Sequence, residues 1–261
     1  PSDRGFPTNI KATLPIGNVF LLPHAKYNWQ DQFTGGEGVG GRSIPCPRGK
    51  MLGGCSSVNG SVYIRGHASD YDGWAAAGNE GWGFDDVLPF FKKHERRVFG
   101  DAAYHGRGGE LDVQQPRSTN PLTRAFVDAA VAAGHRRTDD FNGPEQDGFG
   151  IWDVNQRSGS RLSSSRAFLH PVLSRPNLQV LTDCLVERVV IERGAATGVV
   201  VVRGGQRETI GAAREVIVAA GAINSPHLLM LSGVGDARVL EQHGIQVLHD
   251  LPGVGRNLQD H

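Results

Sequence analysis

Residues 47–66 read PRGKMLGGCSSVNGSVYIRG, and this stretch is the most informative in the chain. It runs from a proline and two basic residues through a double glycine, Gly53-Gly54, into a short apolar run. A double glycine lets the backbone approach something flat or charged, and Asn59 offers both donors and an acceptor. Gly60 leaves room over a ring. On pattern alone, a cofactor-lining segment and a plain glycine turn into a core element are equally good interpretations.

Two nucleotide-binding motifs are excluded. RGKML is not a Walker A loop, because Ile44 stands where that motif needs glycine and Met51 replaces its Ser or Thr. GEGVGG at 36–41 fits GxGxxG, but no strand pattern precedes it, and the two prolines of the following RSIPCPRG forbid a helix. We therefore expect residues 36–41 to form a flexible loop.

The composition is that of a globular protein. The 261 residues suffice for one large domain or two small ones, and the apolar share of 39% and charged share of 21% are ordinary. A net charge of zero gives no support for nucleic acid or an anionic membrane as partner. No run reaches the ~18 apolar residues that a membrane span needs.

The cysteines indicate a reducing compartment. Cys46, Cys55 and Cys184 lie far apart without a CxxC pair, which argues against a disulfide framework and a cysteine zinc site. We therefore expect a cytoplasmic protein. The first residues, PSDRGFPTNIK, lack both an initiator Met and the apolar region of a signal peptide, so a longer gene product is expected.

Hydrolytic and metal chemistry find little support. No GxSxG elbow is present, and a helix cap explains the serines at 163–165. The pairs His94–Glu95 and Asp260–His261 lack metal-ligand spacing and are interpreted as surface charge. FKKHERR at 91–97 is interpreted as the solvated face of a helix.

Local patterns predict the elements of the first two thirds of the chain. Residues 1–46 are expected to be extended loop with a short helix, and residues 69–98 two helices, the first capped by Ser69 or Asp70. Further expectations are a strand at 110–113, a helix after the Asn120 N-cap with Gly134 at its C-terminal end, a possible strand at 149–154 and a short helix from Ser163 to about Pro171.

The last third has a clearer rhythm. Strands are expected at 178–183, 185–193, 197–205 and 206–212, the middle ones separated by glycine turns as in a meander. AREVIVAAG at 213–221 is typical of a buried strand. A helix with Asn224 or Ser225 as N-cap then runs to Leu231. A strand that passes through glycine into a helix N-terminus is a good place for a dinucleotide.

Several ordered blocks resemble one family. PRGKMLGGCSSVNGSVYIRG, with the following DYDGWAAAGNEGWGFDDVLPFFKKHE, closely resembles the first signature of the glucose-methanol-choline (GMC) flavoprotein oxidoreductases. GAINSPHLLMLSGVG at 221–235 is similar to their second signature. YNW at 27–29, GSRLSSSRAFLHP at 159–171 and LPGVGRNLQDH at 251–261 resemble further blocks in the family's order. The resemblance covers essentially the whole chain.

The resemblance implies FAD and oxidation of alcohols to aldehydes or ketones by hydride transfer to flavin N5. Some relatives attach FAD to a histidine where this chain has Val58, so we expect non-covalent FAD. By position, Arg48 to Leu52 would follow the diphosphate and ribityl side, Asn59 to Val62 the ring, Val186 the adenine, and Ala220 and Gly221 the ribose. The implied cofactor-binding residues are Trp29, Arg48, Gly49, Lys50, Met51, Leu52, Asn59, Gly60, Ser61, Val62, Val186, Ala220 and Gly221.

The chain also departs from the family. It lacks the initial strand, a true GxGxxG and the acidic ribose ligand, and it stops before the block that carries the catalytic histidine. We therefore expect a central fragment without a catalytic residue of its own, inactive in isolation. Surfaces that the missing parts would cover are expected to favour self-association.

The predicted fold is α/β with α+β elements: a partial FAD-binding flavoprotein fold with a three-layer core, a β-meander and part of a substrate or cap domain. The FAD-binding domain is expected at 1–66 and 168–261, and the cap part at 67–167. The expected partner is a small-molecule alcohol. A hydroxynitrile lyase that keeps FAD structurally, and a non-catalytic binding module, are the alternatives.

Overall fold

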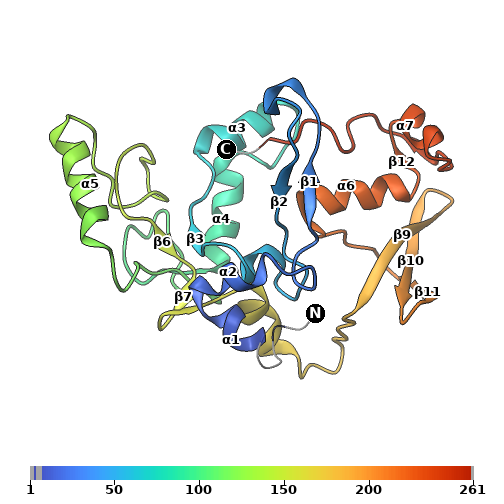
Figure 1. The fold of residues 1–261 in the computed structure, drawn as a ribbon, viewed down its shortest axis with the longest axis horizontal. Helices are drawn as coiled ribbons and strands as arrows, with labels where there is room; N and C mark the ends of the chain where they lie inside the picture. The colour runs from blue at the N-terminus through green and yellow to red at the C-terminus, as the bar shows by residue number, and fades with distance from the viewer. Residues whose placement is uncertain (1–2, 4–7, 260–261) are drawn as a thin grey trace. The chain divides into compact units, whose positions relative to one another are not determined.

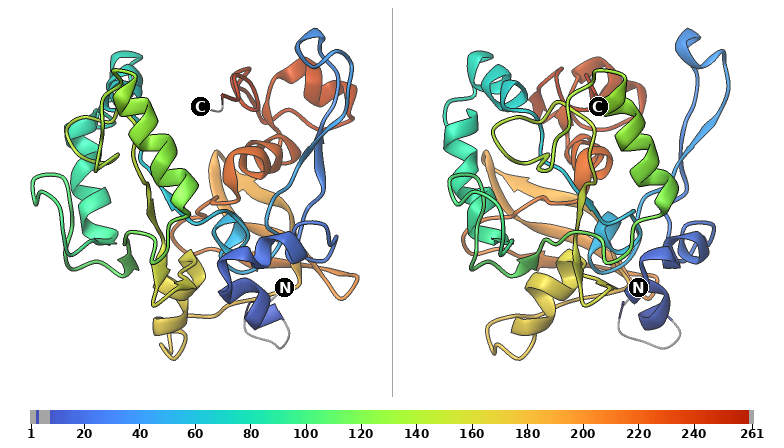
Figure 2. Two further views of the ribbon diagram at one scale, coloured as in Figure 1. Left: turned by 60° about the vertical axis from the view of Figure 1, so that its left-hand side comes forward. Right: turned by 90° about the vertical axis from the view of Figure 1, so that its left-hand side faces the viewer.

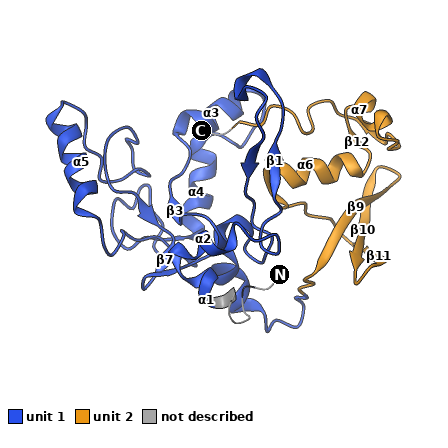
Figure 3. Cartoon of the chain, in the orientation of Figure 1, with its two compact units in different colours: residues 1–179 blue, residues 180–261 orange. Residues whose placement is uncertain are grey.

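The computed structural model describes residue 3 and residues 8–259 of the chain. The chain divides into two compact units, residues 1–179 and residues 180–261 (Figure 3). Both units combine helices with strands, in agreement with the predicted mixed class. The Asp260–His261 pair lies outside the described residues.

The first unit contains short helices joined by long connections (Figure 1). The α-helices are α1 (Thr8–Thr13), α2 (Asn18–Leu21), α3 (Ala68–Ala76), α4 (Phe84–His94) and α5 (Pro121–Ala132). Single tighter or wider turns are η1 (Pro15–Gly17), η2 (Glu37–Val39), η3 (Gly54–Ser57), η5 (His170–Val172) and the π-type η4 (Ser165–Leu169).

The strands of the first unit form two-stranded pairs. Antiparallel pairs are β1 (Asp31–Phe33) with β2 (Ile44–Cys46), β3 (Val62–Tyr63) with β6 (Asp153–Val154), and β7 (Gln156–Arg157) with β8 (Ser160–Arg161); β4 (Glu95–Arg96) and β5 (Leu111–Asp112) are parallel. The β1–β2 hairpin extends as an arm in Figure 2, and GEGVGG forms its irregular tip. Contrary to the expectation, a strand (β1) precedes GEGVGG, but the strand β2 and not a helix follows it, so the segment is not the strand–loop–helix of a dinucleotide fingerprint.

A small core fixes residues 47–66 to the start of the chain. Met51 and Val58 are buried in one cluster with Ala12 of α1, Leu21 of α2 and Tyr27. Full burial of a side chain such as Leu21 stabilises a fold by roughly 1.5–3 kcal/mol. The glycine-rich loop between Met51 and Val58 is therefore held at both ends by apolar contacts.

The helix predictions for this unit hold with two corrections. Asn120 caps α5 by accepting the Leu122 N–H, and Gly134 follows the helix end with φ +93°, as expected. The N-cap of α3 is His67, not Ser69 or Asp70: its Nδ1 accepts the Ser69 N–H, and the Asp70 carboxylate accepts the His67 N–H. The imidazole does the work that a Ser or Asp oxygen does at most N-caps.

The second correction concerns residues 91–97. Helix α4 ends at His94 and the chain extends into β4, where Glu95 is buried, and Arg97 directly after β4 is buried as well. The prediction of a solvated helical face, and of surface charge at Glu95, is wrong for these residues. Partners from distant segments neutralise the two charges, and a local charge pattern contains no information about them.

The second unit is built on an antiparallel sheet. Its strands β9 (Cys184–Glu192), β10 (Ala195–Arg203) and β11 (Gln206–Gly211) form the predicted meander, in the order β11-β10-β9. Helix α6 packs against β9. The remaining elements are α6 (Gly221–Leu231), β12 (Val234–Gly235), α7 (Ala237–Gln242) and β13 (His249–Asp250), which is parallel to β12.

Two predicted strands do not form. Residues 178–183 and residues 213–221 have no strand partner among the described residues, and Ile217 is 78% exposed. A strand exists only through its hydrogen-bonding neighbours, and apolar composition alone does not supply one. The apolar run at 213–220 is therefore a connection in this chain.

Helix α6 begins earlier than predicted. Its first residue is Gly221 and its N-cap is Ala220, whose N–H donates to Ser225 Oγ at 3.0 Å. Asn224 and Ser225 thus lie inside the helix and are not its N-cap. Pro226 is accommodated in the helix although it removes one backbone donor.

Candidate functional site

The side chain of Asn28 fastens the start of the informative stretch. Its Oδ1 accepts the N–H groups of Arg48 at 2.8 Å and Gln30 at 3.0 Å, and its Nδ2 donates to the Leu22 carbonyl at 2.8 Å. The backbones of Asn28 and Gly49 also form an antiparallel bridge. Because Asn28 is buried and its donors and acceptor are paired, residues 48–50 are held in one conformation.

The basic residue Lys50 of RGK contacts an aromatic ring. Lys50 Nζ lies 4.6 Å from the ring centroid of Trp29, a cation–π contact. Trp29 is exposed, and Arg48 and Lys50 are half-buried. The contact brings together Trp29 and the RGK segment, which the sequence had predicted to serve one ligand.

Two glycines allow the following loop to fold back on itself. A Cβ at Gly49 would lie 2.3 Å from the Gly54 carbonyl oxygen, and one at Gly53 would lie 2.4 Å from Ser57 Oγ. Gly53 also has a φ of +86°, which L side chains rarely adopt. Ser57 Oγ donates to the Leu52 carbonyl at 2.8 Å and closes the turn. A close backbone cradle of this kind suits an extended, charged group.

The next four residues are arranged differently. Asn59 and Gly60 are exposed, and Val62 is 40% exposed at the start of β3. A Cβ at Gly60 would meet nothing of the described chain before Val62 Cγ2 at 4.0 Å. The Gly60 N–H has no hydrogen-bond partner among the described residues. The backbone here is therefore open on one side and carries a free donor.

Ser61 closes this segment with strain. It is buried with φ +62°, and its Oγ has no partner in the described part of the chain. Its N–H donates to Asn59 Oδ1 at 3.0 Å, and its carbonyl accepts the Asn155 N–H at 2.8 Å. A strained residue at an exposed loop, over-determined by its neighbours, is typical of functional sites.

Arg161, a residue that the sequence did not single out, contacts this segment. Its Nη1 donates to Asn59 Oδ1 at 2.9 Å and to the Ser56 carbonyl at 3.3 Å. Its Nη2 donates to the Pro15 carbonyl at 2.8 Å. Burial lowers the pKa of the Arg161 guanidinium to about 10, so it remains protonated near neutral pH. The block GSRLSSSRAFLHP contains it, but its contact with Asn59 spans 102 residues.

Three predicted residues lie in the second unit. Val186 is exposed on β9, Ala220 is the N-cap of α6, and Gly221 opens that helix with φ +89°. The connection at 213–220 thus leads through a left-handed glycine into the N-terminus of α6, but the strand that was predicted to precede this glycine does not form.

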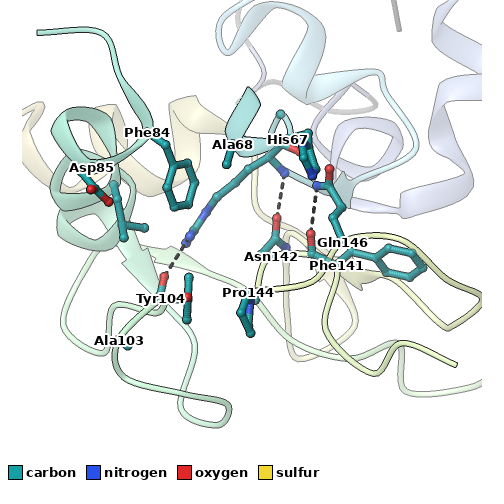
Figure 4. Close-up of a pocket in the computed structure, with 14 residues that line it drawn as sticks. His67, Ala68, Phe84, Asp85, Ala103, Tyr104, Phe141, Asn142, Pro144 and Gln146 are labelled. Atoms are coloured by element: carbon teal, nitrogen blue, oxygen red, sulfur yellow. Dashed lines mark hydrogen bonds between the residues drawn. The ribbon is translucent and has the colours of Figure 1, made fainter. Parts of the chain in front are cut away.

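A cavity in the first unit contains none of the predicted cofactor contacts. It has a volume of about 410 Å³ and lies between Phe84 of α4 and the loop that carries Asn142 and Pro144 (Figure 4). Arg65 lines it: its backbone N–H donates to Asn142 Oδ1 at 2.7 Å and its Nη1 to the Tyr104 carbonyl at 2.8 Å. The cavity is therefore a separate feature of the first unit.

Beside this cavity lies a buried ion cluster. His105 Nδ1 lies 3.1 Å from Glu95 and its Nε2 lies 2.7 Å from Asp140. Arg65 pairs with Glu95 at 2.9 Å, and Arg97 with Asp140 and Asp153 at 3.1 and 2.7 Å. We call these six residues the ion cluster: Arg65, Glu95, Arg97, His105, Asp140 and Asp153.

The titration of the cluster follows its geometry. Burial lowers the pKa of His105, but hydrogen bonds to Asp140 and Glu95 outweigh it and the net pKa is raised. Burial raises the pKa of Glu95, but the His105 and Gly106 N–H donors and Arg65 outweigh it and the net pKa is lowered. Every member has a charged partner, so the cluster stabilises the fold rather than offering a free acid or base.

Metal chemistry and membrane spanning find no support in the described residues. No group of three or more His, Cys, Asp or Glu side chains there could hold a metal ion. The helices within residues 8–259 are all too short or too polar to cross a bilayer. The three cysteines are free thiols.

Comparison with known proteins identifies the family. The GMC oxidoreductase family model matches residues 24–261, and the chain belongs to this family. The chain is 46% identical over 248 residues to the oxygen-dependent choline dehydrogenase of Brucella anthropi and 48% identical over 248 residues to that of Sinorhizobium fredii. Each match covers 95% of this chain and 45% of the relative, so the chain spans about half the length of these proteins.

Solved structures agree with this assignment. Pyridoxine 4-oxidase from Mesorbium loti matches with a TM-score of 0.92 and 34% identity, over 100% of this chain and 51% of the other. An FAD-dependent oxidoreductase from Chaetomium thermophilum matches with a TM-score of 0.83 and 32% identity, over 90% of this chain and 43% of the other. The fold is therefore the N-terminal, cofactor-binding part of a GMC oxidoreductase, and the family implies a flavin.

The residues fit that cofactor. The Gly49–Gly53 cradle suits a diphosphate, and the open Gly60 suits a flat ring. The free Gly60 N–H and the unpaired Ser61 Oγ are polar groups of the kind that hydrogen-bond to a flavin.

Proposed function

We propose that this chain lines non-covalent FAD in a flavoprotein that oxidises the CH–OH group of a small alcohol. Arg48 to Leu52 follow the diphosphate and ribityl side, with Trp29 beside them, and Asn59 to Val62 lie against the isoalloxazine ring. In the second unit, Val186 contacts the adenine, and Ala220 and Gly221 the ribose.

The observation that carries the proposal is the environment of Gly60. Its φ lies outside the left-handed region, and no atom of the described chain occupies the space of a Cβ. Neither backbone conformation nor internal packing therefore requires glycine at this position. A ligand that lies flat on the backbone does require it, because any side chain would occupy the space of the ring.

The chemistry follows from the groups that the chain presents. When bound, FAD would supply flavin N5 as the acceptor of the hydride from the alcohol carbon, and a base would take the hydroxyl proton so that a carbonyl forms. The free Gly60 N–H is suited to donate to negative charge that develops on the ring. The fixed Asn59 side chain holds the backbone in the conformation that points this donor outward. We assign the base to a part of the full-length protein outside this chain, which spans about half the length of its curated relatives.

Val58 supports dissociable FAD. It is buried in the apolar core cluster and has no nucleophilic atom with which to form a bond to the flavin. Acid precipitation of the full-length holoprotein should leave the yellow cofactor in the supernatant. A flavin that stays with the pellet would show a covalent link.

The class of reaction is tested by anaerobic reduction of the bound flavin. Choline, pyridoxine and a panel of primary and secondary alcohols are mixed with the full-length holoprotein without oxygen. At least one should bleach the flavin band near 450 nm, because hydride transfer reduces the ring. No bleaching by any alcohol, together with release of cyanide from a hydroxynitrile, would replace the oxidoreductase with the lyase alternative.

Four further proposals concern the whole protein. Residues 1–66 and 168–261 form the FAD-binding domain and residues 67–167 the cap part, which limited proteolysis tests through cuts near residues 66 and 167.

The isolated chain does not turn over alcohol, which a direct assay checks. It self-associates through exposed apolar side chains such as Ile217, which sedimentation velocity checks. The free cysteines favour a cytoplasmic location, which cell fractionation tests.

A further inference from the structure

Arg161 is a buried cation without a counter-ion. Arg161 is 1% exposed. The three groups that accept hydrogen bonds from its Nη atoms are neutral: Asn59 Oδ1 and the carbonyls of Ser56 and Pro15. No carboxylate of the described residues pairs with it, and its Nε has no partner there. Burying a charge is costly unless an opposite charge offsets it, so this arrangement needs an explanation.

Two other arginines of this unit, Arg97 and Arg157, do have carboxylate partners. Arg97, equally buried, pairs with Asp140 and Asp153 in the ion cluster. Arg157, four residues before Arg161 on the same β7–β8 hairpin, pairs with Asp112. The fold thus supplies carboxylates to neighbouring guanidinium groups, while Arg161 is directed at Asn59, the residue that precedes Gly60.

The uncompensated charge contacts the segment that is proposed to line the flavin ring. Two-electron reduction puts negative charge on the N1–C2 side of an isoalloxazine ring, and a fixed positive charge in a low-dielectric site stabilises it more than water does. Residues 59–62 are the segment proposed to lie against that ring. Arg161 contacts this segment through Asn59, whose Oδ1 accepts hydrogen bonds from both Arg161 Nη1 and the Ser61 N–H.

We propose that Arg161 is a positioning residue for the flavin: through Asn59 it fixes the ring-facing segment, and its permanent charge favours the reduced cofactor. This inference rests on the proposed function, because it requires the ring to lie against residues 59–62. The positive charge of Arg161 would therefore raise the reduction potential of the flavin, an effect that a neutral hydrogen-bond donor at this position would not have.

The test is the two-electron midpoint potential of the flavin in the full-length holoprotein, measured against a reference dye. Arg161→Met removes the charge at similar length, Arg161→Lys keeps it, and Arg157→Met is the control on the same hairpin. We expect Arg161→Met to make flavin reduction at least about tenfold less favourable, which is about 30 mV for a two-electron couple. Arg161→Lys should recover most of that shift, and Arg157→Met should leave the potential unchanged.

The outcomes separate this inference from the proposed function. A wild-type protein that binds no FAD would refute the proposed function itself. Bound FAD with equal potentials in wild type and Arg161→Met would refute only the role of Arg161, as would an equal shift in Arg161→Lys. Should Arg161→Met fail to fold by circular dichroism, Arg161→Gln, which can still donate to Asn59 Oδ1, takes its place with the same expected shift.

Discussion

Gly53 and Gly54 are adjacent and both have positive φ, yet their surroundings differ. At Gly54 (φ +52°) a Cβ would meet nothing within 4 Å, whereas at Gly53 it would overlap Ser57 Oγ and press on Ser163 and Ser165. Gly54 is therefore required only by its backbone conformation. Gly53 is required by conformation and by space, because the loop packs against the segment that follows β8 (Ser160–Arg161).

We expect Gly54→Ala to lower the free energy of unfolding by about 1 kcal/mol, the usual penalty of a left-handed alanine. Gly53→Ala should lower it by about 2–4 kcal/mol, because overpacking adds roughly 1–3 kcal/mol to that penalty. Urea denaturation of the two variants measures both values. Equal losses would show that the contact with Ser57 does not constrain the loop.

The sequence predicted one partner of the contact between Asn59 and Arg161 but not the other. Asn59 and Gly60 were predicted from their neighbours in the chain, since the signature is contiguous. Arg161 was missed because nothing local distinguishes it from the arginines around it. Only the fold reveals that its partner is Asn59, 102 residues away, and that no carboxylate among the described residues neutralises it.

Between elements, the ion cluster joins segments that are far apart in sequence. Glu95 and Arg97 follow α4 (Phe84–His94), His105 lies in a loop, and Asp140 and Asp153 come from beyond α5 (Pro121–Ala132). Its hydrogen bonds replace the apolar packing that other parts of a core use. The stability of this region should therefore depend on pH.

The direction in which pH changes the free energy of unfolding follows from the pKa shifts of the cluster. His105, whose folded pKa is raised, stabilises the fold fully below the ordinary histidine pKa of about 6.5, and this stabilisation is lost as pH rises through the raised pKa. Glu95 and Asp140, whose pKa values are lowered, stabilise the fold above about pH 4.5 and lose this effect on acidification. The stability due to these three groups is therefore greatest between these limits, whereas Asp153, whose pKa is raised by burial, loses its contribution as pH rises through that raised pKa.

We expect the wild-type chain to lose unfolding free energy between pH 6 and pH 9. His105→Gln should lose less over the same range, because the titrating group is gone. His243→Gln, at an exposed position after α7 (Ala237–Gln242), is the control and should behave as wild type. Denaturant titrations at the two pH values measure the difference. An identical pH dependence in His105→Gln and wild type would show that the cluster does not titrate as described.

Element predictions succeeded where local chemistry decides the outcome. Helix α5 has its cap, proline and terminal glycine in the sequence, and the β9–β11 meander has turn glycines between β-branched runs. They failed where partners decide: the apolar run at 213–220 has no neighbouring strand in the described chain, and Glu95 is buried only because Arg65 and His105 meet it.

For the whole molecule, the order of the blocks was more informative than any single motif. GxGxxG at 36–41 was a false match, whereas five blocks in family order agreed with the family model over residues 24–261. The identity of the substrate could not be predicted, because the chain spans about half the length of its curated relatives.

We propose that the open backbone at Gly60 faces the flavin ring. The most direct measurement is the FAD occupancy of purified full-length protein carrying Gly60→Leu, from the ratio of flavin to protein absorbance. Gly73→Leu is the matched control, because Gly73 of α3 (Ala68–Ala76) also has open space around it and no positive φ. Gly60→Leu should fold with normal circular dichroism yet lose at least about 90% of its flavin, equivalent to about 1.4 kcal/mol or more of binding free energy. Gly73→Leu should keep its flavin, and unchanged occupancy and turnover in Gly60→Leu would show that the ring does not lie against Gly60.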